Sequence, residues 1–430
     1  MGHLFLAASD TIPPFWMAFP FVILLLLIAI APIAAPHFWE KFYAIISLSL
    51  GSGTAVYYLT ALHKSAPLIH VAYEYLGFIA LVGSLYVVSG GIFIRVKGEA
   101  TPSTNLLYLL VGAILSNLIG TTGASMLLIR PWIRMNKYRI TGFHIVFFIF
   151  IVSNVSGLLT PIGDPPLFLG FLKGVPFWWT LQHAWQAWLI AISILLVCFY
   201  LLDRRNFLRA PSEIREHATH QETWKIQGLR NLPLIALILI AVFLPFGWRE
   251  SLMALAGVLS WILTPKAVHD ANHFDFEPLK EVGFLFAGIF TTMLPALEIL
   301  NAHASSLGLR SEMQFYWWTG TLSGLLDNAP TYLAFLATAF GLNGMHLDHD
   351  MPRFIAAHGN LLLAISVSSV FFGALTYIGN SPNLMVKKLA DQQHVHTPGF
   401  LAYIFTYALP ILLPVLAIVS LLFFSPWKVF

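Results

Sequence analysis

Uninterrupted apolar runs of about 20 residues recur along this chain, and they constrain its fold more than any other feature. A helix of that length is long enough to cross the hydrocarbon core of a bilayer. Only 10% of the residues are charged, whereas an ordinary soluble protein has about 25%. We therefore expect an all-α polytopic membrane protein. The runs cover residues 17–35, 42–62, 71–94, 142–159, 183–202, 231–247, 282–300 and 400–425.

The residues that would support an enzyme or a bound cofactor are missing from this sequence. It contains no G-x-x-x-x-G-K-[ST] motif, and its longest polar stretch, residues 203–230, is too short for a nucleotide-binding domain. The single cysteine, Cys198, excludes an internal disulfide and a cysteine-based metal site. We expect no catalytic activity, no cofactor and no nucleic-acid partner, so any transport would draw on an ion gradient.

The distribution of Lys and Arg predicts the orientation in the membrane. If residues 105–129 and 315–341 each enter the membrane and return to the same side, most of the 23 basic residues lie on one face. The positive-inside rule makes that face cytoplasmic. The sequence Gly-Thr-Thr-Gly interrupts 105–129 at its centre, which suits a hairpin tip. We expect eleven spans and two re-entrant hairpins in the cell inner membrane, with 203–230 as a cytoplasmic linker and both termini outside.

A repeated motif divides the chain into two halves. "TPIGDPPLF" at 160–168 aligns with "TYIGNSPNL" at 376–384, and "LSNLIGTTGAS" at 115–125 aligns with "LSGLLDNAPTY" at 322–332. Two such halves entering from opposite faces are the pattern of an inverted-repeat transporter. The expected units are residues 1–202, with the hairpin 105–129 and a broken helix 142–172, the linker 203–230, and residues 231–430, with the hairpin 315–341 and a broken helix 354–390.

Proline and glycine in the two repeated motifs are expected to open the helices. The freed backbone groups are tolerable only where they line a polar cavity, because lipid offers them no partner. A carboxylate at this depth is costly, so Asp164 and Asp327 should face that cavity or a partner. The alternative is that both acids only cap half-helices or hold the breaks together.

The functional interpretation is a cation site near the membrane midplane. Each acid would bind Na+ or a proton, never both, as a transient metal site. Neighbouring hydroxyl and amide oxygens would complete the coordination, since a hard cation prefers oxygen ligands. The residues expected to form the ion or substrate site are Asp164, Asp327, Asn328, Thr160, Gly163, Thr376, Gly379, Asn380, Ser116, Asn117, Thr121 and Thr122.

Three segments resemble the ion transporter superfamily and, within it, the citrate-transport and sodium/proton-antiporter families. They are "SNVSGLLTPIGDPPLFLG", "FEPLKEVGFLFAGIFTTMLPALE" and "LSGLLDNAPTYLAF". The resemblance implies a scaffold part, a transport part with two hairpins, and commonly a homodimer. Dicarboxylate carriers of the superfamily have Ser-Asn-Thr at both hairpin tips. Here the tips read Ser116-Asn117-Leu118 and Ser323-Gly324-Leu325.

Two functions remain open from the sequence. Two acids, with no Lys or Arg in the expected site, favour a secondary active sodium/proton antiporter over a carrier of naked carboxylates. The alternative is a citrate-like organic anion transporter coupled to Na+ or H+, because half-helix N-termini attract anions.

Overall fold

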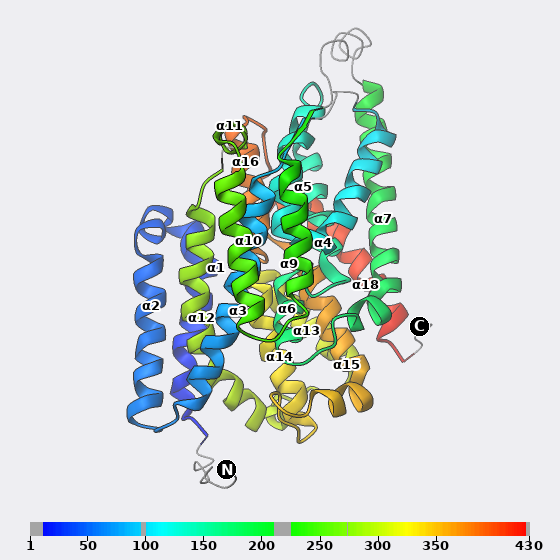
Figure 1. The fold of residues 1–430 in the computed structure, drawn as a ribbon. Helices are drawn as coiled ribbons and strands as arrows, with labels where there is room; N and C mark the ends of the chain where they lie inside the picture. The colour runs from blue at the N-terminus through cyan, green and yellow to red at the C-terminus, as the bar shows by residue number, and fades with distance from the viewer. Residues whose placement is uncertain (1–11, 96–99, 210–224, 273, 427–430) are drawn as a thin grey trace.

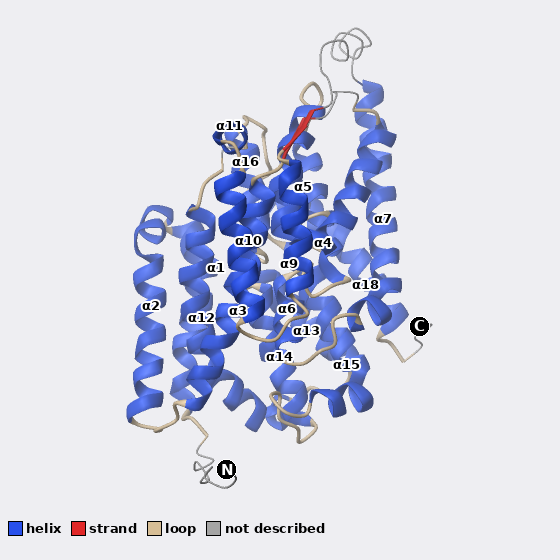
Figure 2. Cartoon of the chain, viewed as in Figure 1, coloured by secondary structure: helices blue, strands red, loops and turns tan. Residues whose placement is uncertain are grey.

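The computed structural model describes residues 12–95, 100–209, 225–272 and 274–426, and the chain is almost entirely helical (Figures 1 and 2). The first half contains α1 (Phe19–Ala34), α2 (Pro36–Thr60), α3 (Ala66–Gly90), α4 (Pro102–Met135), α5 (Gly142–Ile151), α6 (Pro165–Leu172) and α7 (Trp179–Arg209). Short 3-10 turns, η1 (Phe15–Ala18) and η2 (Val155–Leu158), precede α1 and follow α5.

The second half repeats this mixture of long, short and broken helices. It contains α9 (Leu232–Ala241), α10 (Trp248–Leu263), α11 (Lys266–Ala271), α12 (Glu277–Ala302), α13 (Glu312–Leu325), α14 (Asn328–Leu342), α15 (Met351–Phe372) and α16 (Ser381–Gln392). It ends with α17 (Phe400–Ala402), a π-helix (Tyr403–Leu412) and α18 (Leu413–Phe423). Its 3-10 turns are η3 (Leu229–Asn231), η4 (Ala304–Leu307) and η5 (Gly373–Leu375).

Large apolar side chains cover the outside of the helical bundle. Ile45 on α2, Val197 on α7 and Ile262 on α10 are each more than half exposed. A soluble protein rarely leaves so much apolar surface in water, whereas lipid accepts it. Eight helical segments among the described residues are long and apolar enough to cross a membrane. The expected all-α polytopic membrane protein is confirmed.

The expected eleven crossings stay a prediction; the described residues supply eight long apolar segments and two shorter ones. One of the eight long segments is α4, which folds back on itself and is not a crossing. The shorter α5, α9 and α10 run alongside the remaining seven (Figure 1).

A hairpin is formed within α4. Gly120 has φ +76°, a backbone conformation that glycine adopts without a steric penalty, and it separates the helix into two arms. The Tyr108 hydroxyl donates to the Leu128 carbonyl at 2.8 Å, and Asn105 Nδ2 donates to Asn136 Oδ1 at 2.8 Å. These contacts hold the two arms side by side.

The second hairpin consists of α13 and α14, which meet at Leu326 and Asp327. Both residues have extended backbones between the two helices. Asp327 is the N-cap of α14, and its Oδ1 accepts the backbone N–H of Ala329 at 3.0 Å. Such a cap satisfies one of the free amides at a helix start.

A small antiparallel pair of strands, which the sequence did not predict, closes one end of the bundle. Strand β1 (Phe93–Arg95) pairs with β2 (Lys225–Gln227). The strands lie near the end of α7, at the top of Figure 1, and we call this end of the bundle the linker face. The other end is called the opposite face. Most of the expected linker, residues 210–224, lies outside the described residues, as do the chain ends at 1–11 and 427–430.

Candidate functional site

Two interrupted helices carry the repeated motif. Residues 159–164 have no helical conformation between η2 and α6, and residues 376–380 have none between η5 and α16. A Cβ on Gly163 would lie 2.2 Å from the Gly157 carbonyl oxygen, and one on Gly379 would lie 2.6 Å from that of Gly373. Both positions therefore require glycine, because backbone crosses backbone there. The two pairs occupy equivalent places in the repeat.

Equivalent threonines tie each break to the hairpin of its own half. The Thr160 hydroxyl donates to the Asn117 carbonyl at 2.6 Å and accepts the Gly163 N–H at 3.1 Å. The Thr376 hydroxyl donates to the Gly324 carbonyl at 2.7 Å and accepts the Gly379 N–H at 3.1 Å. Both hydroxyls are thus engaged in bracing the breaks, and neither contacts Asp164.

The carboxylate of Asp164 accepts hydrogen bonds from residues of both halves of the chain. Its Oδ1 accepts from the Thr121 hydroxyl at 2.7 Å and from Asn380 Nδ2 at 3.0 Å, and its Oδ2 accepts from Asn328 Nδ2 at 2.6 Å. Thr121 follows the tip of the first hairpin, Asn328 begins the second arm of the second hairpin, and Asn380 lies in the second break. Four elements that are far apart in the sequence therefore converge on one side chain.

The side chain of Asp164 is buried among uncharged hydrogen-bond donors. Only 1% of the residue is exposed, and its three hydrogen-bond donors carry no charge. Among the described residues, no Lys, Arg or His forms an ion pair with it. Hydrogen bonds help to stabilise a buried carboxylate but do not neutralise its charge.

Two further buried asparagines, Asn154 and Asn383, were not predicted from the sequence and lie next to this cluster. Asn154 Oδ1 accepts from Asn380 Nδ2 at 3.2 Å, and Asn154 Nδ2 donates to Asn383 Oδ1 at 2.7 Å. Asn383 Nδ2 in turn donates to the Gly373 and Thr376 carbonyls. Asn154 lies within the "SNVSG" segment. A polar amide so close to a helix break could have marked it in the sequence as a residue of the site. Its partner 226 residues away was not readable from the sequence.

A cavity of about 730 Å³ reaches the site. Thr122, Asp327, Asn328, Asn380 and Ser381 line its inner wall. The wall also includes residues of β1, α11 and the end of α16, elements that lie toward the linker face in Figure 1. The cavity therefore extends from the site toward that face.

Basic side chains line part of this cavity, contrary to the expectation of a site without Lys or Arg. They are Arg130, Arg134 and Lys388, accompanied by Asp275, Glu277 and Glu281. The guanidinium Nη1 of Arg130 is buried and has no hydrogen-bond partner among the described residues. The expectation holds for the immediate neighbours of Asp164 and fails for the cavity wall, because the second arm of α4 and α16 bring distant basic residues there.

Ser116 and Asn117 hold the first hairpin against the broken helix. The Ser116 hydroxyl donates to the Val152 carbonyl at 2.9 Å, and Asn117 Oδ1 accepts the Leu159 N–H at 3.0 Å. Neither contacts Asp164. Of the expected polar residues of this hairpin, only Thr121 touches the carboxylate and only Thr122 lines the large cavity.

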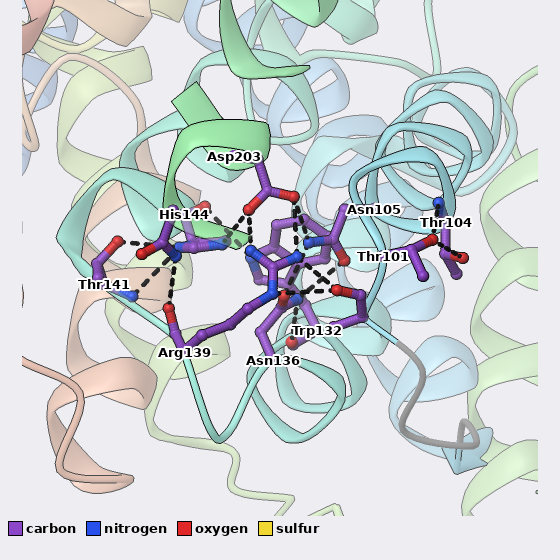
Figure 3. A network of polar contacts seen from close by, with 11 residues as sticks. Thr101, Thr104, Asn105, Trp132, Asn136, Arg139, Thr141, His144 and Asp203 are labelled. Atoms are coloured by element: carbon purple, nitrogen blue, oxygen red, sulfur yellow. Dashed lines mark hydrogen bonds and ion pairs between the residues drawn. The ribbon is translucent and has the colours of Figure 1, made fainter. Parts of the chain in front are cut away.

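A buried polar network anchors the base of the first hairpin (Figure 3). The fully buried Asp203 of α7 accepts from Asn105 Nδ2 at 2.8 Å, lies 3.0 Å from His144 Nε2 and forms an ion pair with Arg139. Asn105 is also bonded to Asn136 at the other end of α4. The network thus fixes both arms of the hairpin to α5 and α7, and places His144 away from the Asp164 cluster.

A second ionic cluster links three elements at the opposite face. Lys173 Nζ lies 2.8 Å from Glu74 Oε1 and 2.8 Å from Asp348 Oδ1, and His70 Nε2 lies 3.1 Å from the same Glu74 oxygen. We call these four residues the Lys173 cluster. His70, Glu74 and Asp348 are close enough to share a metal ion, but the ammonium already supplies a cation between the two acids.

Residues 10–424 match the model of the family described as "Putative citrate transport". No curated protein matches the chain. The family match covers nearly all of the sequence and confirms the resemblance carried by the motifs of the two halves. This chain, a membrane transporter, belongs to the "Putative citrate transport" family.

Proposed function

We propose that this transporter is a secondary active sodium/proton antiporter. The main support is the environment of the Asp164 carboxylate. Its carboxylate is buried where both halves meet, and only neutral donors contact it. Burying a single charge is costly unless a proton or a counterion compensates it. If a proton and Na+ compensate the same charge in turn, each displaces the other, and their opposite movements become coupled.

The orientation is part of the proposal. Arg130, Arg134 and Lys388 lie along a cavity that extends toward the linker face, and excess basic charge favours the cytoplasmic side. We propose that the protein lies in the inner membrane and that its linker face is on the cytoplasmic side. A cysteine introduced at Arg215, in a chain with Cys198→Ser, should then react only with reagents supplied from the cytoplasmic side. Labelling from outside would reverse the orientation.

The antiport proposal is tested in everted membrane vesicles. Addition of Na+ to energised vesicles should dequench a pH-sensitive dye, and Asp164→Asn should abolish this response. The control is Asp270→Asn, the same chemical change at an exposed residue, which should leave the response intact. If Asp164→Asn is produced in normal amounts and keeps the wild-type response, Asp164 is not part of the mechanism.

An organic anion is the second candidate, and specific features favour it. Arg130 and Lys388 line the cavity, and the N-termini of α6, α14 and α16 all begin at the site. Helix N-termini and basic side chains attract carboxylates. Uptake of labelled citrate into proteoliposomes, with and without a Na+ gradient, distinguishes the two. Saturable uptake would favour the anion carrier.

A further inference from the structure

The Lys173 cluster joins the far ends of two helices that begin at the site. Helix α6 has Asp164 as its N-cap and Lys173 as its C-cap. Helix α14 begins at Asn328, and Asp348 lies in the connection that follows it. At 1.5 Å per residue, the eight residues of α6 place the cluster about 12 Å from the site. The cluster lies toward the opposite face and the large cavity toward the linker face, so the site lies between them.

The third element of the cluster is α3, which supplies none of the three hydrogen bonds to Asp164. Glu74 lies near the start of α3, and its carboxylate is 2.8 Å from the Lys173 ammonium, which also lies 2.8 Å from Asp348. Helix α3 packs against α10 and α12, whereas α6 packs against α14. The cluster therefore connects a helix outside the site to the two helices that begin in it.

Helix α3 also covers the site on the side of the opposite face. A Cβ on Gly77 would lie 3.6 Å from Leu172 Cδ2 and 3.3 Å from Glu250 Oε1, so α3, α6 and α10 are in close contact beside the cluster. One turn further along α3, Leu81 borders a small cavity that Asp164 also borders. A substrate that leaves the site toward the opposite face between α3 and α6 therefore meets this contact and then the cluster.

The charges at this contact are buried and depend on one another. The side chains of Lys173 and Glu74 are only 8% and 7% exposed. Among the described residues, Lys173 and His70 are the basic groups within ion-pair distance of Glu74, because Arg249 of α10 pairs with Glu250 instead. A buried ion pair is weak evidence for stability, and a switch between two arrangements is among its best-attested uses. Both charges would regain water if α3 separated from α6.

We propose that the Lys173 cluster is the closed gate of the opposite face. While the cavity is open toward the linker face, the cluster holds α3 against the ends of α6 and α14. Opening of the site to the opposite face requires the ion pair between Lys173 and Glu74 to break. The gate serves a cation or an anion alike, because access to one site from two faces in turn does not depend on the charge that is carried.

The experiment measures the rate at which introduced cysteines react with a membrane-impermeant thiol reagent, in the full-length chain with Cys198→Ser. Leu81→Cys lies behind the gate, at a position that is 2% exposed. Thr122→Cys lies on the wall of the large cavity. Intact cells and everted vesicles present the two faces to the reagent separately. The first cysteine reports opening of the opposite face, and the second reports opening of the linker face.

Lys173→Met strands the Glu74 carboxylate, which regains water only when the gate opens. Labelling of Leu81→Cys from the opposite face should rise about tenfold. A fully stranded buried charge would give more than about a hundredfold, but His70 remains 3.1 Å from Glu74. Labelling of Thr122→Cys from the linker face should fall at the same time, because the two openings alternate. A general loss of stability would instead raise both rates.

Two controls accompany this variant. Lys173→Met/Glu74→Gln strands no charge and should return both rates toward those of the parent chain. Lys64→Met breaks an ion pair with Glu298 that joins the start of α3 to α12 at the same face, and it should leave both rates unchanged. If Lys173→Met leaves the opposite face closed or raises both rates, or if Lys64→Met acts like it, the assignment of the gate is overturned. The labelling needs no transported ion, so these outcomes do not bear on the antiport proposal.

Discussion

Removal of the ammonium from the Lys173 cluster gives a direct test of the electrostatics of this fold. Lys173 and Glu74 have side chains that are only 8% and 7% exposed, whereas that of Asp348 is 52% exposed. Lys173→Met keeps most of the aliphatic side chain but leaves the Glu74 carboxylate without its nearest cation. Stranding one partner of a buried ion pair costs about 3–5 kcal/mol.

Two features of the cluster set the expected value within that range. The exposed pair with Asp348 adds at most about 1 kcal/mol. His70 lies 3.1 Å from the same Glu74 oxygen and can compensate part of the stranded charge. We therefore expect a loss of about 3 kcal/mol. For a chain of this size that corresponds to a fall in melting temperature on the order of 5 °C, which thermal unfolding in detergent can measure.

The matched control is the double variant Lys173→Met/Glu74→Gln. Because the glutamine carries no charge, nothing is stranded, and most of the lost stability should return. If the double variant is as unstable as Lys173→Met alone, an uncompensated charge is not the cause of the loss, and the reasoning is refuted.

The pKa shifts in the Lys173 cluster predict how its contribution to stability depends on pH. Burial alone would lower the pKa of Lys173, but the carboxylates of Glu74 and Asp348 outweigh it and raise that pKa. Burial would raise the pKa of Asp348, but the Lys173 ammonium outweighs it and lowers that pKa. The Asp348 contribution is complete above its ordinary pKa of about 3.9 and is lost as the pH falls through the lowered value. The Lys173 contribution is complete below about 10.4 and is lost as the pH rises through the raised value. His70 also belongs to the cluster, and a histidine changes its charge between about pH 5 and pH 8. The loss of stability caused by Lys173→Met should therefore be smaller near about pH 5, where a protonated His70 compensates Glu74, than near about pH 9, where His70 is neutral. An equal loss at both pH values would contradict this assignment.

Three further substitutions probe the site and its supports. Gly163→Ala would place a Cβ 2.2 Å from a backbone oxygen, so little folded protein should be recovered by size-exclusion chromatography, whereas Gly53→Ala, with no atom within 4 Å of the added Cβ, should be recovered normally. Asn154→Ala removes an acceptor that orients Asn380, and we expect transport to fall about tenfold at unchanged yield; unaltered transport would remove Asn154 from the site. Asp203→Asn leaves the Arg139 and His144 side chains without their carboxylate and should cost about 3–5 kcal/mol in thermal unfolding, and an unchanged melting temperature would show that the network is not a structural anchor.

The sequence alone was sufficient for the features that depend on local composition. Lipid acts on each segment separately, so the length and polarity of a run decide whether it can lie within the membrane. Proline and glycine act on their own turn of helix, which is why the breaks at 159–164 and 376–380 lie within the motifs. The motifs also carry the family resemblance that the match over residues 10–424 confirms.

Only the tertiary structure decided which polar groups meet. Asp164 and its partners Asn328 and Asn380 are separated by 164 and 216 residues, and no local rule links them. The basic residues on the cavity wall, the β1–β2 pair and the Lys173 cluster likewise join segments from different parts of the chain. Hydropathy and helix breaks are properties of neighbours in the sequence, whereas a binding site depends on side-chain direction and on how the helices pack.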